Sequence, residues 1–308
     1  MIIGIFILLV GLFILGMSML RYGLFHLSGE SLKIWLTKTT GVPWKGFLAG
    51  IFITCLLQSS SAVMIITIGL ISVKMLTFPQ SIGIILGTNI GTTITTELIT
   101  FDIGDYLLPF VIVAIVLLFM KKKKFQSTGL ILLGISFVFM AMGGFEYLAI
   151  PLKEFGIIDT LLSNLDKSYL LSVTAGTIIT AVIQSSTATT AIIMGFLSSG
   201  AMNLDTGIAI LLGSNIGTCA DAFLASIGGG KEARLTAYAH VWLNVLGVLI
   251  FYPFIGILAE IGPTLAANAH VQLAHISVIF NVLCSLAVLP FAQSFGKLIM
   301  KIHGGKSV

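Results

Sequence analysis

Long apolar stretches separated by short polar segments run through the chain from residue 2 to residue 290. A membrane-spanning helix needs roughly 20 apolar residues, and several stretches reach that length. We expect spans at residues 2–20, 81–100, 103–120, 127–144, 206–226, 235–258 and 271–290. Two further apolar runs, 46–73 and 172–199, carry a Gln-Ser-Ser motif at their middle. The pattern predicts an all-α polytopic membrane protein.

The chain also repeats itself at an offset of 126 residues. Ala49–Thr92 aligns with Ala175–Thr218 without a gap, and 19 of these 44 positions are identical. A weaker echo at an offset of 118 links residues 11–18 with residues 129–136. We expect a single transmembrane domain, 1–308, with one repeat at about 1–124, a second at about 125–260 and an extra span at 271–290. The strongest matching blocks are Gln58–Ala62 with Gln184–Ala188, and Gly87–Thr92 with Gly213–Thr218.

The interrupted runs are too long for straight spans. As one helix, residues 46–73 would extend about 42 Å, against a hydrocarbon core of about 30 Å. Split at the motif, each arm reaches about 18 Å, the length of a re-entrant hairpin. Successive helical residues turn by about 100°, so Ser59, Ser60 and Ser61 converge only at a hairpin tip, where serine is a good N-cap. Irregular backbone at membrane depth lines a wet cavity or is buried in protein, so the sequence predicts a site twice.

Positive charges set the expected orientation, because cytoplasmic loops are enriched in Lys and Arg. The run Lys121–Lys124 marks the cytoplasmic side. With both hairpins returning to their own side, the N-terminus lies outside and the C-terminus inside. Hairpin one then enters from the cytoplasm and hairpin two from outside, which is an inverted repeat of the kind found in secondary transporters. The same scheme places Asp102 and Asp105 outside, and places these basic residues inside: Arg21, Lys33, Lys38, Lys45, Lys297, Lys301 and Lys306.

Composition agrees with a lipid environment. The chain is 57% hydrophobic and 9% charged, whereas soluble domains carry about 25% charged residues. The net charge of +4 is too small to indicate nucleic acid as a partner. The three cysteines show no metal-ligand spacing, and no Ser-His dyad, paired carboxylate or metal motif indicates an enzyme. We expect no cofactor and the lipid bilayer as a partner.

The polar groups of the two motifs suit an oxyanion and a hard cation. Hydroxyls and helix N-termini donate to an oxyanion such as phosphate, while amide and hydroxyl oxygens suit sodium. The set contains no Lys, Arg or metal-ligand His, so we expect bound sodium to supply the missing positive charge. For Ser and Thr the alternative is a local bond to a carbonyl one turn back. Asp221 is an intramembrane carboxylate, either an ion-binding group or a structural hydrogen-bond acceptor.

The doubled motifs, with the opening Gly-Leu-x-x-Leu-Gly-x-Ser, resemble the sodium/phosphate cotransporter family over about residues 5–295. The resemblance implies a secondary active transporter that couples sodium to inorganic phosphate across the plasma membrane by alternating access. Many bacterial relatives carry a PhoU-like C-terminal domain, which we expect this chain to lack, and relatives often have Thr at position 221. Two later stretches, around His240 and Asn244 and around His275 and Asn281, also look family-like. The implied phosphate ligands are Ser59, Ser60, Ser61, Ser185, Ser186 and Thr187, and the implied sodium ligands are Gln58, Gln184, Asn89, Thr92, Ser214, Asn215, Thr218 and, from its charge, Asp221.

Three matters stay open at this level. Hydroxyl donors do not distinguish phosphate from sulfate or another small oxyanion. Polar groups at the midplane would also line a passive anion channel. The sequence leaves open the direction of transport, the sodium stoichiometry and the oligomeric state, a homo-oligomer included.

Overall fold

The computed structural model describes residues 1–28 and 42–304, and within these ranges the regular structure is entirely helical. Three of the basic residues used for orientation, Lys33, Lys38 and Lys306, lie outside the described residues. The helices are α1 (Ile2–Ser28), α3 (Pro43–Leu57), α4 (Ser60–Ser72), α5 (Phe78–Leu98), η1 (Gly104–Tyr106), α6 (Leu107–Leu118), α7 (Lys123–Lys153), α8 (Gly156–Lys167), α9 (Tyr169–Ile183), α10 (Ser186–Ser198), α11 (Leu204–Gly217), α12 (Cys219–Ser226), α13 (Gly230–Phe251), η2 (Tyr252–Phe254), α14 (Ile255–Leu265), α15 (Ala269–Val288), η3 (Leu289–Phe291) and α16 (Ala292–His303).

Five helical segments of the described chain are long and apolar enough to cross a membrane, which confirms the predicted class of all-α membrane protein. Each contains one of the predicted spans. The predicted span 81–100 falls on α5, and 103–120 falls on η1 and α6, which together form a shorter apolar segment. The five are Ile2–Leu27, Lys123–Lys153, Leu204–Ser226, Gly230–Leu265 and Ala269–His303.

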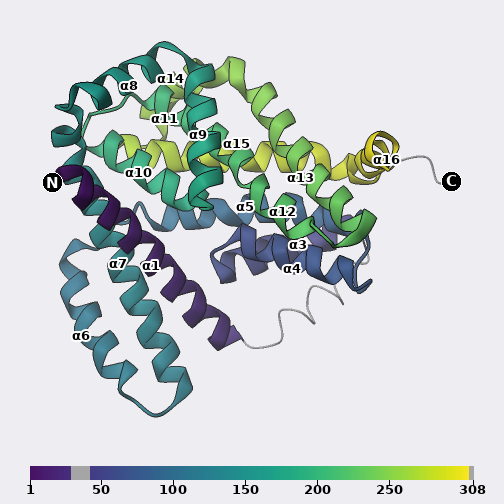
Figure 1. Ribbon diagram of the computed structural model, residues 1–308, viewed down its shortest axis with the longest axis horizontal. Coiled ribbons are helices and arrows are strands. Elements are labelled where there is room, and N and C mark those ends of the chain that lie inside the picture. Colours follow the sequence, from purple (N-terminus) through teal and green to yellow (C-terminus); the bar gives the residue numbers. More distant parts are fainter. Residues whose placement is uncertain (29–41, 305–308) are drawn as a thin grey trace.

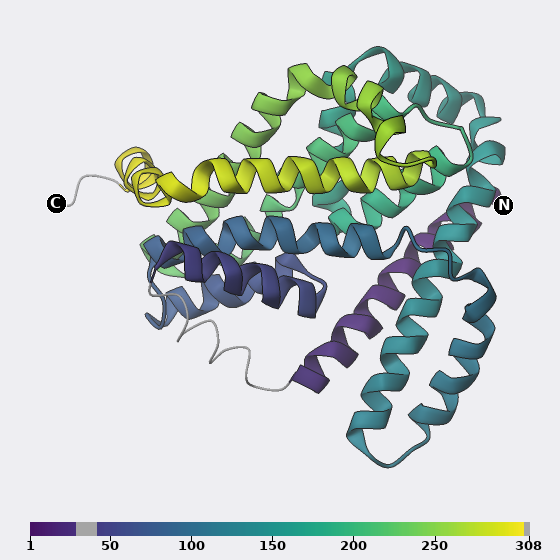
Figure 2. The same ribbon diagram turned by 180° about the vertical axis from the view of Figure 1, so that it is seen from behind.

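Helices α1, α6 and α7 form a group that projects from the rest of the molecule (Figures 1 and 2). Helix α6 contacts α7 and buries only Ala114 among its residues, leaving Leu108 and Val116 exposed. Helix α1 packs closely along α7, because a Cβ atom on Gly16 would lie 2.8 Å from the carbonyl oxygen of Gly134. These two glycines are equivalent at the offset of 118, so this contact joins matching positions of the two sequence copies.

The offset of 126 also appears in the helix contacts. A Cβ atom on Gly87 would clash with the carbonyl oxygen of Phe47 where α5 crosses α3, and one on Gly213 would clash with that of Val173 where α11 crosses α9. Both residues of the second pair lie 126 positions after those of the first. Helices α3 with α5 and α9 with α11 therefore pack through the same backbone approach, which only glycine permits.

Buried apolar side chains form two clusters. One joins α3, α4, α5, α13 and α16, and the other joins α1, α7, α10, α11 and α15. Each broken helix pair therefore has its own apolar support. Because the two pairs pack in different clusters, the two breaks have different neighbouring helices.

Candidate functional site

Each Gln-Ser-Ser motif interrupts a helix with the same backbone geometry. Gln58 has φ 52° and ψ 34°, and Gln184 has φ 56° and ψ 32°. This left-handed conformation costs a non-glycine residue roughly 1–2 kcal/mol and stops a right-handed helix. The next residue then caps the following helix: the Ser59 hydroxyl accepts from the backbone N–H of Ala62 at 3.2 Å. Ser185 accepts from Ala188 at the same distance.

The helices on either side of the breaks are short. Helices α3 and α9 have 15 residues each, and α4 and α10 have 13. At 1.5 Å per residue these arms are about 20–22 Å long, less than a bilayer core of about 30 Å. Their first helices begin three residues before the predicted runs, because Pro43 occupies the first turn of α3 and Ser168 caps α9. The first-turn N–H groups of α4 and α10 lie at the breaks, where the helix dipole is positive.

At the first break, groups from elsewhere in the chain occupy the motif. The Arg21 guanidinium in α1 donates through Nε to the carbonyl oxygen of Gln58 at 3.0 Å. The Ser61 hydroxyl donates to a carboxylate oxygen of Asp221 in α12. The charges of Arg21 and Asp221 also attract each other. The side-chain amide of Gln58 donates back to the carbonyl of Cys55.

The sequence analysis expected no Lys or Arg at the motifs, but the structure brings the guanidinium of Arg21 to the first break. In the sequence alone, Arg21 marks only the cytoplasmic side. The signal that could have identified it is its position inside an apolar run, since α1 continues beyond it to Ser28 through Tyr22, Leu24 and Phe25. A charge within such a run indicates a functional partner rather than a helix end.

At the second break, the equivalent side chains have no hydrogen-bond partner among residues 1–28 and 42–304. Gln184 is exposed, and within the described ranges its side chain has no hydrogen-bond partner. The hydroxyls of Ser186 and Thr187 are likewise unpartnered among the residues that the structure describes, although Thr187 is 5% exposed. In the first motif, Ser60 is the hydroxyl in the same condition. These groups are available to a ligand.

The two Gly-x-Asn-Ile-Gly-Thr blocks, Gly87–Thr92 and Gly213–Thr218, make different hydrogen bonds. Asn89 in α5 donates to the side-chain oxygen of Asn244 in α13 at 3.1 Å, and Asn244 donates to the sulfur of Cys219. Asn244 therefore links α13 to α5, while the Nδ1 atom of buried His240 lacks a partner within the described chain. The remaining candidates satisfy the local alternative: Thr92 bonds to Thr88 O at 2.8 Å, Ser214 to Leu211 O at 2.7 Å, Asn215 to Leu211 O at 3.0 Å and Thr218 to Asn215 O at 2.7 Å.

Helices α11 and α12 meet at Thr218, one turn before Asp221. Helix α12 contacts α4, and Asp221 reaches Ser61. Asp221, which follows the Gly213–Thr218 block, thus contacts the first Gln-Ser-Ser motif directly through Ser61. Elsewhere, Glu97 pairs with Nδ1 of His275 at 2.8 Å. Among the described residues, no group of three or more His, Cys, Asp or Glu side chains could hold a metal ion.

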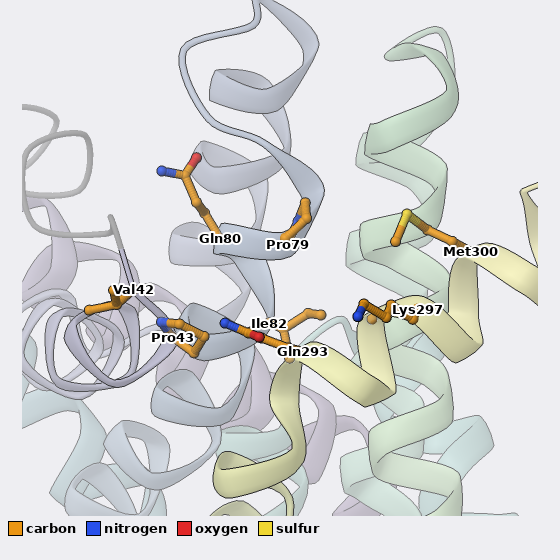
Figure 3. A pocket seen from close by; sticks show the side chains of 9 residues that line it. Val42, Pro43, Pro79, Gln80, Ile82, Gln293, Lys297 and Met300 are labelled. Atoms are coloured by element: carbon orange, nitrogen blue, oxygen red, sulfur yellow. The ribbon is translucent and has the colours of Figure 1, made fainter.

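Cavities lie both beside the motifs and away from them. A cavity of about 420 Å³ adjoins the first break and is lined by Gln58, Thr95 and mainly apolar side chains. A smaller one of about 260 Å³ lies between the starts of α3 and α5 and helix α16, where Gln293 and Lys297 are among the lining residues (Figure 3). This second cavity includes no residue of either motif.

Long apolar helices, with two further helices broken by polar motifs, define a multi-pass membrane protein. Residues 12–146 and 155–283 match the Na+/Pi-cotransporter family, and the chain belongs to this family. It is a family of transporters and not of enzymes. No solved structure matches the chain.

Curated relatives match either most of the chain or a short part of it. The protein named "Uncharacterized protein YqeW" from Bacillus subtilis is 36% identical over 287 residues, which is 93% of this chain and 94% of that protein. The "Putative inorganic phosphate export protein YjbB" of Escherichia coli K12 is 23% identical over 95% of this chain, which spans only 54% of that longer protein. Human "Sodium-dependent phosphate transport protein 2C" is 36% identical over 86 residues, 27% of this chain and 14% of that protein.

Proposed function

We propose that this protein is a secondary active transporter that couples sodium to the movement of inorganic phosphate across the plasma membrane. The observation that carries the proposal is the pair of matching helix breaks, each with serine hydroxyls at the N-terminus of a helix. Such groups donate to an oxyanion. Family membership and the names of the phosphate-related relatives support phosphate as the oxyanion.

The proposed phosphate ligands are the motif hydroxyls. Ser60, Ser186 and Thr187 have hydroxyls without partners in the described chain, and Ser59 and Ser185 present the helix ends that they cap. Ser61 becomes available when Asp221 releases it. The proposed sodium ligands are the oxygens of Gln58, Gln184, Asn89, Thr92, Ser214, Asn215, Thr218 and Asp221. A hydroxyl that donates to its own helix keeps its oxygen lone pairs for a cation.

We further propose that the two broken helix pairs are re-entrant hairpins of an inverted repeat, with the N-terminus outside and the C-terminus in the cytoplasm. Arms of about 20–22 Å and the matching glycine contacts Gly87 with Phe47 and Gly213 with Val173 support this arrangement. Substrate sites of inverted-repeat transporters lie between the repeats near the midplane. Alternating exposure of the two breaks would then carry phosphate from one side to the other.

The test is phosphate flux into proteoliposomes. Radiolabelled phosphate is followed with an imposed sodium gradient, with choline replacing sodium, and with excess sulfate as competitor. We expect saturable flux that stops without sodium and persists in sulfate. Loss of flux in sulfate would change the cargo, a non-saturating sodium-independent current would indicate a channel, and the absence of sodium-dependent phosphate flux with either protein orientation would refute the proposal.

The site assignment has its own test. Gln184→Ala combined with Ser185→Ala removes a free amide and a cap at the second break. Hydrogen bonds to a charged group contribute roughly 1.5–3 kcal/mol each, so phosphate transport should fall at least about tenfold. The matched control is Asn164→Ala with Ser163→Ala on α8, away from the breaks. Unchanged transport by the well-folded Gln184/Ser185 variant would remove these residues from the site.

A further inference from the structure

Two opposite charges flank the first break and are absent from the second. Arg21 holds the carbonyl oxygen of Gln58 at 3.0 Å, and Asp221 accepts the hydroxyl of Ser61. At the repeat offsets of 118 and 126, the position equivalent to Arg21 is Phe139 and that equivalent to Asp221 is Thr95. The second break therefore has no charge at either equivalent position, and the pair is a feature of the first break alone.

Each of these charges is stabilised by an opposite charge nearby. An isolated charge in the interior of a membrane protein is expensive, and breaking a buried pair leaves its partner uncompensated. Here Arg21 and Asp221 do not bond each other directly, but they contact residues three positions apart at the first break, Gln58 and Ser61, so each opposite charge lies in the field of the other. The carboxylate also takes the hydroxyl of Ser61, which is one of the donors proposed for phosphate. Asp221 thus fills the position of an oxyanion in the structure described.

We propose that Arg21 is the fixed cation for phosphate at the first break, and that Asp221 is an internal anion which phosphate displaces and sodium then neutralises. This inference rests on the proposed function. In the exchanged state, phosphate pairs with Arg21 and Ser61, while sodium pairs with Asp221. Phosphate alone would leave Asp221 uncompensated, and sodium alone would leave Arg21 uncompensated. Each solute therefore raises the affinity for the other, which is a reciprocal coupling.

The test measures equilibrium binding of radiolabelled phosphate to the purified full-length protein across a range of sodium concentrations at constant ionic strength. In the wild-type protein the Kd for phosphate should fall as sodium rises. Arg21→Gln removes the fixed cation and should raise this Kd by about 10- to 100-fold at saturating sodium. Asp221→Asn removes the internal anion, so phosphate should bind without sodium and its Kd should change less than about threefold across the series.

Controls separate charge exchange from general damage. Lys167→Gln and Asp159→Asn make the same charge changes at exposed positions on α8 and should retain wild-type binding. Arg21→Gln combined with Asp221→Asn leaves a neutral tip if either single variant folds poorly, and it should bind phosphate weakly with no sodium dependence. A purely structural role would alter protein yield or melting temperature without changing the sodium dependence of the Kd.

The outcomes distinguish this inference from the proposed function. If the wild-type protein binds phosphate with sodium and both single variants keep that sodium dependence, the charge exchange is wrong while the transporter proposal stands. Persistent sodium-dependent binding in the double variant would have the same meaning. If the wild-type protein shows no phosphate binding with any sodium concentration, the proposed function fails and this inference fails with it.

Discussion

Gln58 and Gln184 share one backbone conformation, and the serine after each caps the next helix in the same way. Their side-chain surroundings differ. The first break is closed by Arg21 and by Asp221, whereas Gln184 at the second break is exposed and unpartnered in the described chain. Backbone geometry that depends on local sequence is thus repeated, while the partners supplied by distant helices are not.

The helices that follow the breaks differ as well. Helix α4 packs against α12 and α13, and a Cβ atom on its Gly69 would meet nothing within 4 Å. Helix α10 packs against α7, and a Cβ atom on the equivalent Gly195 would lie 2.6 Å from Cβ of Phe145. The first unit therefore gains its restraint at the tip, through charges, and the second gains it along the arm, through packing.

The largest expected effect concerns the close glycine contact that both repeats share. Gly87→Val and Gly213→Val each place a side chain against a carbonyl oxygen of the neighbouring helix. Overpacking typically costs 1–3 kcal/mol and sometimes more, and a backbone obstacle has little room to move, so we expect about 3 kcal/mol or more in both. Yield of monodisperse protein and melting temperature measure this. Gly11→Val, which meets nothing within 4 Å, is the control; a large loss in only one variant would contradict equivalent packing.

The next effect separates the two units. Gly195→Val should destabilise the protein by about 1–3 kcal/mol, because Phe145 and the backbone of α7 must shift. Gly69→Val at the equivalent position should change stability by less than about 0.5 kcal/mol. Melting temperatures of the two purified variants give the comparison directly. Equal losses would show that α4 is as tightly enclosed as α10.

A third comparison addresses the caps. Losing a serine N-cap costs about 1 kcal/mol, so Ser59→Ala and Ser185→Ala should have similar global effects. Local opening should differ, because Arg21 and Asp221 still hold the first break in Ser59→Ala. Hydrogen exchange measured by mass spectrometry should therefore rise more in the first turn of α10 than in the first turn of α4. A larger rise in α4 would count against the restraint by charges.

The sequence was sufficient for the parts of the site that depend on neighbouring residues. The Gln-Ser-Ser motifs predicted both breaks, and the offset between Gly87 and Gly213 corresponds to matching helix contacts. It was not sufficient for the Arg21 contact. That contact joins α1 to the end of α3, and its two residues are 37 positions apart in the sequence. Ser61 and Asp221 are 160 positions apart. Such proximity depends on tertiary packing, which periodicity and spacing do not determine.

The smallest expected effect comes from moving one interhelical hydrogen bond from the second repeat to the first. Thr177 in α9 donates to the carbonyl oxygen of Gly213 in α11 at 3.0 Å, and the equivalent position in α3 is Ile51. Interhelical hydrogen bonds in membrane proteins contribute about 0.6 kcal/mol on average, so Thr177→Val should destabilise by about that amount while preserving shape. The reverse change, Ile51→Thr, gives α3 a hydroxyl facing the same stretch of α5 near Gly87, and a matching small gain would show that the two crossings are interchangeable. Melting temperatures of both variants and of the double variant decide this. If Thr177→Val loses nothing, neither the bond to Gly213 nor the bond to the carbonyl of Val173, 2.9 Å away in the same helix, adds to stability. The difference between the units then lies in the charges at the first tip and the packing of the arms.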